Sequence, residues 1–224
     1  MSRLDPSFVP ITIEAELASA PVTIHPLLID GILHYAGGVV AGLRAPSGWA
    51  GSAELGGMRL PLAQVHWHDR WWFAASQAVP VGPEVRSYLH RRPMTEDARR
   101  WTSAKSLNQS QGPDKALRVP VFRRIAMARI RWTAVGDPTA VAWLLAHVHG
   151  IGNDSTHGHG WVTRWSVTRG GPPLGHYVGD VRLRHLPDDA ARFGLGPDAR
   201  RTRLPLTPPY HERARAVACT QVTR

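Results

Sequence analysis

The stretch Gly150-Ile-Gly-Asn-Asp-Ser-Thr-His-Gly-His-Gly160 joins two segments of different periodicity. Residues 137–148, before it, carry apolar side chains at helical spacing, and residues 161–168, after it, have the composition of a strand. Its four glycines permit positive φ angles and the close approach of another backbone. Successive amides in such turns can also form a concave site for phosphate. The stretch therefore predicts either a phosphate-contacting loop or a plain helix-to-strand connection.

The helix before the loop has a specific start signal. Asp137 is a favourable N-capping residue, and Pro138 stands at the first helical position, where proline is tolerated. The buried face of this helix is expected to consist of Val141, Leu144, Leu145 and Val148.

A strand and a helix are expected near the N-terminus. Residues 8–17 alternate apolar with polar from Val9 onward, which indicates a half-buried strand. Pro26-Leu-Leu-Ile-Asp-Gly-Ile-Leu-His-Tyr-Ala36 has the spacing of a helix that ends near Gly37 or Gly42. Gly31 inside this helix costs roughly 1 kcal/mol relative to alanine, and a close packing contact would explain it.

The middle of the chain combines strands with a basic insertion. Residues 60–77 predict two strands with a turn at 68–70. The stretch 82–117 holds seven Arg and Lys but few periodic apolar residues, so we expect a functional or disordered insertion. Residues 116–135 are the strongest strand region. Arg129 and Arg131 share one face of it and need a solvent or phosphate partner.

The pattern weakens after Gly170. We expect a strand or two in 177–186, a short helix in 188–193, an extended segment in 204–211 and a terminal tail in 213–224. The predicted organisation is one domain over 1–170, with its insertion at 82–117, and a C-terminal extension over 171–224 that packs on the core.

The charge balance favours a polyanionic partner. The 224 residues contain 27 Lys and Arg against 17 Asp and Glu, a net charge of +10, and almost all the basic residues are arginines, whose forks suit phosphate. We expect no signal peptide, and the sequence holds no apolar run long enough to span a bilayer. The single cysteine, Cys219, excludes an intrachain disulfide and a cysteine-based metal site. We therefore expect a cytoplasmic protein with no membrane partner.

The expected elements together predict an α+β fold. Their order is that of a ferredoxin-like (RRM-like) βαββαβ core, with a long basic insertion and an extended C-terminal segment added to it. Three local features narrow this: the helix at 26–36, the glycine loop running into Gly158-His-Gly-Trp-Val-Thr-Arg-Trp165, and the segment Pro208-Pro-Tyr210. Together they resemble the RAMP superfamily of CRISPR-associated proteins. Within it they are most similar to the Cas-five-type subunit of type IV (class 1) effector complexes.

The resemblance implies a non-catalytic subunit of a CRISPR ribonucleoprotein that serves antiviral defence. Such a subunit binds the 5′ handle of the CRISPR guide RNA (crRNA) and caps the filament of backbone RAMP subunits. The large subunit would be a further partner, and the target nucleic acid would be met only indirectly. In the family the glycine loop lies near RNA, and a thumb often protrudes where this chain has its basic insertion.

The expected RNA-binding residues lie in the glycine loop, in the strand after it, in the strand region 116–135 and in the insertion. They are Gly150, Gly152, Ser155, His157, Gly158, His159, Gly160, Arg164, Arg123, Arg124, Arg129, Arg131, Arg91, Arg92 and Lys105. No catalytic residue, cofactor or metal is expected.

Alternatives remain for the histidines around the loop, which are His147, His149, His157 and His159. Their ordinary pKa near 6.5 suits general acid and base roles, so the runner-up function is a CRISPR RNA-processing endoribonuclease of the same superfamily. A metal site is less favoured, because a closed zinc site needs four ligands and usually includes cysteine. The plainest interpretation places the first two at a helix end and the others against RNA or solvent. An RNA-binding domain unrelated to CRISPR is a third hypothesis.

The nine tryptophans could pack in the core or stack on bases. We expect core packing for Trp67, Trp132, Trp143, Trp161 and Trp165. We expect surface positions for Trp71, Trp72 and Trp101.

Overall fold

The computed structural model describes residues 7–21, 26–42, 59–82, 85–90, 121–126, 128–152, 155, 158–178, 181–190, 199–208, 210 and 213–222. For 85–90, 121–126, 177–178, 181–182, 188, 199–200, 213 and 221–222 it describes the backbone. The fold is mixed α+β, with mostly antiparallel sheets and few helices.

A four-stranded antiparallel sheet forms the centre of the molecule. Its strands are β1 (Val9–Leu17), β4 (Val79–Val81), β7 (Arg129–Gly136) and β8 (Val162–Arg169), in the order β4-β7-β1-β8. In the middle of the sheet Ile13 of β1 stands opposite Trp132 of β7 and Val167 of β8. The predicted first strand and the strand after the glycine loop are both confirmed.

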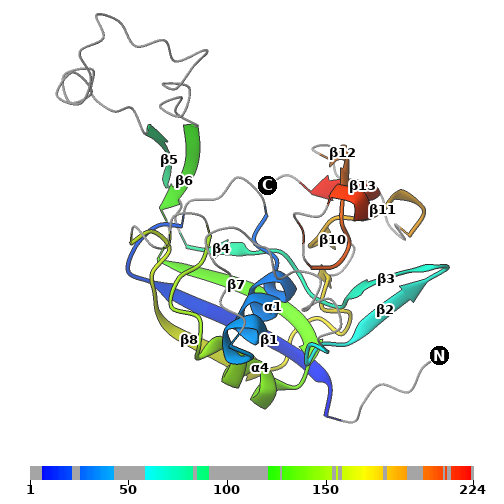
Figure 1. The fold of residues 1–224 in the computed structure, drawn as a ribbon, viewed down its shortest axis with the longest axis horizontal. Helices are drawn as coiled ribbons and strands as arrows, with labels where there is room; N and C mark the ends of the chain where they lie inside the picture. Colours follow the sequence, from blue (N-terminus) through cyan, green and yellow to red (C-terminus); the bar gives the residue numbers. More distant parts are fainter. Residues whose placement is uncertain are drawn as a thin grey trace, which may run out of the picture.

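Two helices, α1 (Ile29–Val40) and α4 (Pro138–Leu145), lie over one face of this sheet (Figure 1). Because side chains alternate along a strand, every second residue of β1 and β7 points to the helices and the rest point away. The core between these layers is fully or almost fully buried. It includes Ile11, Ile13, Ala15, Leu33, Ile130, Trp132, Val141 and Leu145.

The helix ends follow from local chemistry, with one difference from expectation. Asp137 Oδ1 accepts hydrogen bonds from the amides of Thr139 and Ala140, so the predicted cap is confirmed. Helix α1 begins later than predicted. Leu28 is extended, with φ −93° and ψ 133°, and forms a β-bridge with Gln77, which holds the preceding residues out of the helix.

The predicted hairpin is present but stands outside the main sheet. Strands β2 (Gln64–Trp67) and β3 (Arg70–Phe73) pair with each other across a turn at His68, whose φ is 53°. They form their own two-stranded sheet. It is the short β4 that joins the four-stranded sheet, beside β7.

The basic insertion and the strand region after it both differ from expectation. Residues expected to lack structure form β5 (Val85–His90), which pairs with β6 (Val121–Ala126) away from the four-stranded sheet (Figure 1). The region 116–135 is therefore not one strand but two, β6 and β7, in different sheets. Each strand has a different hydrogen-bonding partner, and periodicity does not reveal partners. Residues 91–120 lie outside the described ranges.

The C-terminal segment is more ordered than predicted. It contains β9 (Tyr177–Val178), β10 (Val181–Arg182), β11 (Leu186–Pro187), η3 (Asp188–Ala190), β12 (Ala199–Leu204), η4 (Arg213–Arg215) and β13 (Val217–Val222). The expected terminal tail is wrong, because β13 is the central strand of the sheet β11-β13-β12 and Cys219 and Thr220 on it are fully buried. Whether 171–224 is a separate extension remains a prediction.

Candidate nucleic-acid interface

The glycine loop is closed at its base by backbone hydrogen bonds. Gly150 and Trp161 form an antiparallel bridge, the Val162 amide donates to the His149 carbonyl, and the Ile151 amide donates to the Gly160 carbonyl. The two ends of the loop are therefore fixed to each other, and the bridge extends β8 toward the end of α4.

Two loop glycines have positive φ angles but different surroundings. Gly160 has φ +65°, and a Cβ there would lie 2.0 Å from the Ile151 carbonyl oxygen, so no side chain fits. Gly158 has φ +81°, but a Cβ there would meet nothing within 4 Å. Its carbonyl oxygen accepts a 2.6 Å hydrogen bond from Ser19 Oγ. Gly160 is thus a packing requirement, whereas Gly158 leaves space on the surface.

Two tryptophans in the segments that flank the loop in the chain are exposed, contrary to the expectation of core packing. Trp143 on α4 is 55% exposed and meets the His147 ring edge-on, with ring centroids 5.2 Å apart. Trp161 is 50% exposed and stacks on His149, with centroids 6.3 Å apart and an interplanar angle of 24°. The reason is rotational position: Trp143 points away from the sheet on which Val141 and Leu145 of the same helix are buried.

The other tryptophan expectations have mixed outcomes. Trp132 is fully buried and Trp165 is partly buried against it, as expected for core residues. Trp72 was expected on the surface and is only 3% exposed, because Leu186 and Leu206 of the C-terminal segment cover it. Trp101 lies outside the described residues.

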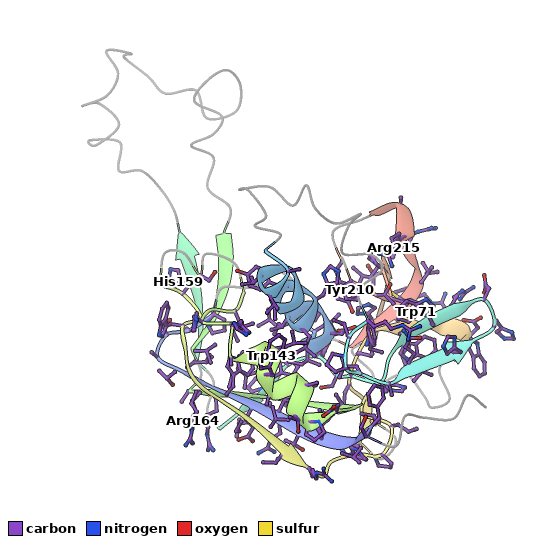
Figure 2. The ribbon with its side chains drawn as sticks, turned by 60° about the horizontal axis from the view of Figure 1, so that its bottom comes forward. Trp71, Trp143, His159, Arg164, Tyr210 and Arg215 are labelled. Carbon is purple, nitrogen blue, oxygen red and sulfur yellow. The ribbon has the colours of Figure 1, made fainter. Side chains whose placement is uncertain are left out.

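The sheet face that points away from the helices carries paired charges. Arg131 on β7 lies 2.6 Å from Glu14 Oε1, and Arg164 on β8, which Figure 2 labels, lies 2.6 Å from Glu16 Oε1. Both carboxylates belong to β1. Arg129 is also exposed on this face. We expected a solvent or phosphate partner for Arg129 and Arg131. Arg131 instead has a carboxylate partner, and so does Arg164.

A buried charge network joins α1 to the C-terminal segment. Arg184 Nη1 lies 3.4 Å from Asp30 Oδ2, and both side chains are fully buried. Arg184 also donates to the carbonyls of Phe73 and Leu206 at 2.8 Å, and the Tyr210 hydroxyl donates to Asp30 Oδ2 at 2.5 Å. Burial alone would lower the pKa of Arg184, but Asp30 and Tyr210 outweigh it and the pKa is raised. Burial and then the Asp30 charge raise the pKa of Tyr210, which stays a neutral phenol.

A cavity of about 550 Å³ lies between α1, the glycine loop and the C-terminal segment. One wall is α1, with Ile32 and Tyr35, and the second is the loop, with Gly150 and Gly152. The third comes from the C-terminal segment and includes His185, and Figure 2 shows Tyr210, which also lines the cavity, beside α1. Tyr35, another lining residue, is 45% exposed.

His185 in the cavity wall is held in one protonation state. Its Nε2 lies 2.8 Å from the Pro205 carbonyl oxygen, which can only accept, so Nε2 carries the proton. Burial, and after it the Arg184 charge, lowers the pKa of His185 to about 3. The ring is neutral at physiological pH, and its buried Nδ1 is an acceptor that meets no donor in the described part of the chain.

Comparisons with known proteins do not assign the chain to a family. No family model matches it, and no curated protein matches it at a significant level. None of the helices within the described ranges is long and apolar enough to cross a membrane. The RAMP resemblance therefore rests on the quoted motifs.

The predicted RNA-binding residues fall into separate groups. Gly150, Gly152 and Ser155 line the cavity, and Gly158, His159 and Gly160 stand in the loop beyond it. Arg129, Arg131 and Arg164 lie on the opposite sheet face, so the structure does not bring them to the cavity. Arg123 and Arg124 belong to β6, for which the backbone is described. Four other expected residues lie outside the described residues: Arg91, Arg92, Lys105 and His157.

Two of the histidines near the loop contact tryptophans: His147 meets Trp143, and His149 stacks on Trp161. Within the described ranges, no group of three or more His, Cys, Asp or Glu side chains could hold a metal ion. Sequence reasoning missed Arg184 and His185. The sequence showed only the two motifs that these residues join, which are the helix at 26–36 and the segment Pro208-Pro-Tyr210. It gave no sign that the two motifs are in contact.

Proposed function

We propose that this protein is a non-catalytic RNA-binding subunit of a type IV CRISPR ribonucleoprotein, built on a ferredoxin-like core and acting in the cytoplasm. The strand order β4-β7-β1-β8, with all neighbours antiparallel and one helix after β1 and one after β7, is compatible with a βαββαβ unit. The partners in this proposal are the 5′ handle of the guide RNA, the backbone RAMP subunit and the large subunit.

The observation that carries the proposal is the exposure of two tryptophans in the segments that flank the glycine loop in the chain. Trp143 and Trp161 each expose half or more of their area and each contact a histidine ring. Stacking of a base on such a ring contributes about 1–3 kcal/mol and tolerates any base, because every base has a π-face. Single-stranded RNA is the nucleic acid whose bases are free to stack in this way.

The net charge of +10 supports the same partner and predicts its salt dependence. Each phosphate that is neutralised on a single strand contributes a slope of about −0.7 in log K against log salt. Because Arg131 and Arg164 already have carboxylate partners, much of the phosphate contact in this proposal comes from other arginines.

The test is a binding titration with fluorescently labelled single-stranded repeat RNA at several salt concentrations. The variants are Trp143→Ala and Trp161→Ala, and the matched control is Leu174→Ala, an exposed apolar residue 45% accessible to solvent. We expect each tryptophan variant to lose about fivefold or more in affinity, with the control unchanged. A flat salt dependence, or wild-type affinity in both tryptophan variants, would contradict the proposal.

A cleavage assay on the same RNA separates the proposal from the endoribonuclease alternative. We expect the purified protein to leave the RNA intact. Site-specific cleavage that is lost in His159→Ala or His157→Ala would make the protein an enzyme and overturn its non-catalytic assignment.

A further inference from the structure

Strand β8 forms one edge of the four-stranded sheet (Figure 1). The amide of Gly170, which follows the strand, donates to the Pro10 carbonyl of β1. Because hydrogen-bonding groups alternate along a strand, the even-numbered residues of 164–170 bond to β1 and the odd-numbered ones turn outward. Within the described part of the chain, nothing hydrogen-bonds to the outward backbone groups of Trp165, Val167 or Arg169.

The chain on either side of β8 sets the length of this open edge. At the start of the strand the Val162 amide donates to the His149 carbonyl, so the loop before β8 covers the outer side there. At the other end the chain leaves the strand at Gly170, whose φ is +106°. The open edge is therefore residues 165–169.

The two edges of the sheet differ in whether they can accept another strand. The opposite edge, β4, is three residues long and has Pro80 at its centre, which has no amide hydrogen to donate. The open edge of β8 contains no proline, and the Arg164 side chain just before it is bound to Glu16. Proteins usually block edge strands with prolines or free charges, so β8 is left ready to pair.

The open edge is complementary to itself. When two copies of β8 lie antiparallel with their Val167 residues opposite each other, Trp165 of each stands opposite Arg169 of the other. This register forms about six hydrogen bonds, whereas a shift by two residues leaves one outward residue of each copy unpaired. On the polar side Ser166 then faces Thr168, a favourable pair of hydroxyl side chains, and no arginine stands opposite another.

We propose that this protein forms a twofold-symmetric dimer in which the β8 edges of two copies pair antiparallel about Val167. Twofold pairing closes on itself, so it gives a dimer and not a growing chain. About six hydrogen bonds correspond to a small interface, at roughly one bond per 100–200 Å². We therefore expect a dissociation constant on the order of 10 μM. The dimer does not require RNA.

The first test is sedimentation velocity of the full chain from about 1 to 200 μM, where the wild type should shift from monomer to dimer. Val167→Pro removes an outward amide that the monomer does not use, so it should weaken the dimer at least about tenfold. Val167→Ala, the matched control, keeps the amide and should still dimerise. Circular dichroism and thermal melting check that both variants are folded. A wild type that is monomeric throughout, or a folded Val167→Pro that dimerises normally, would overturn the proposal.

Charged side chains test the pairing without changing the backbone. Ser166→Lys/Thr168→Glu places opposite charges across the dimer, and Ser166→Lys/Thr168→Lys places like charges at the same positions. We expect the first variant to dimerise at least about threefold more tightly than the second. Equal dissociation constants would refute the antiparallel β8 pairing.

A disulfide measures the register directly. Ser166 and Thr168 of the second copy form a pair without hydrogen bonds, with Cα atoms about 4.5 Å apart, which is within disulfide range. An equal mixture of Ser166→Cys and Thr168→Cys should therefore crosslink on mild oxidation faster than either variant alone. Cys219 is fully buried and is common to both variants. Crosslinking that is as fast in one variant alone would overturn the proposed register and the dimer built on it.

Discussion

Tyr210 donates a hydrogen bond to Asp30 across 180 positions of the chain, at a distance of 2.5 Å. The aromatic ring of the same tyrosine lies against Gly31, where an added Cβ would be 3.2 Å from it. Arg184 completes the contact by donating to the Tyr210 hydroxyl at 3.2 Å while pairing with Asp30. The first helix and the Pro-Pro-Tyr segment are thus joined by one buried network.

We expect Tyr210→Phe to destabilise the protein by about 1–3 kcal/mol, because Asp30 loses a donor inside a buried site. Urea denaturation measures this change. Tyr35→Phe is the control on the same helix, at a residue that is 45% exposed, and it should have the smaller effect. Equal effects of the two substitutions would mean that the buried network adds no stability beyond that of a hydroxyl on a half-exposed tyrosine.

Gly31→Ala should destabilise the protein even though alanine is the better helix former by about 1 kcal/mol. The added methyl group would press on the Tyr210 ring, and that ring cannot withdraw because Asp30 and Arg184 hold its hydroxyl. In a Tyr210→Ala background the same change should become stabilising. A double-mutant cycle by denaturation tests this reversal of sign, and additive effects would refute it.

The loss of stability caused by substitutions in the glycine loop should depend on how closely each glycine is packed. Gly160→Ala would place a methyl group 2.0 Å from the Ile151 carbonyl, so we expect a loss of several kcal/mol or failure to fold. Gly158→Ala meets open space and should lose about 1–2 kcal/mol from its positive φ alone. Thermal melting of both variants gives the order. The reverse order would contradict the close packing of Gly160 against the Ile151 carbonyl.

His185 should make stability depend on pH. Its folded pKa of about 3 lies below the ordinary 6.5, so between these values the unfolded state binds the extra proton. This contribution is fully present above pH 6.5 and is lost as pH falls toward 3, at no more than about 1.4 kcal/mol per pH unit. His185→Gln should therefore show a shallower loss of unfolding free energy from pH 6.5 to 4.5 than the wild type. Identical slopes would mean that His185 does not titrate in this way.

If RNA binds to the sheet face that points away from the helices, the carboxylates on β1 should weaken this binding. Glu14→Gln with Glu16→Gln would release Arg131 and Arg164, and we expect about threefold to tenfold tighter RNA binding with a steeper salt dependence. Asp189→Asn breaks a comparable exposed ion pair with Arg70 elsewhere and is the control. Unchanged affinity in the double variant would place the interface on the helix side alone.

The sequence by itself determined the elements whose signals are local. The alternation after Val9 predicted β1, Asp137-Pro138 predicted the start of α4, and the turn near His68 predicted the β2–β3 hairpin, because each depends on neighbours within a few residues. Gly31 even predicted a close contact, although not with which residue.

Tertiary structure alone decided which elements meet. It separated β6 from β7, made β13 a central strand, buried Trp72 and exposed Trp143, because pairing partners and the direction of a helix face are set by segments distant in the chain. The candidate site follows the same rule. His185 becomes a neutral acceptor because burial, and after it the Arg184 charge, lowers its pKa while the Pro205 carbonyl fixes its tautomer, and neither its burial nor its cavity is encoded in any local pattern.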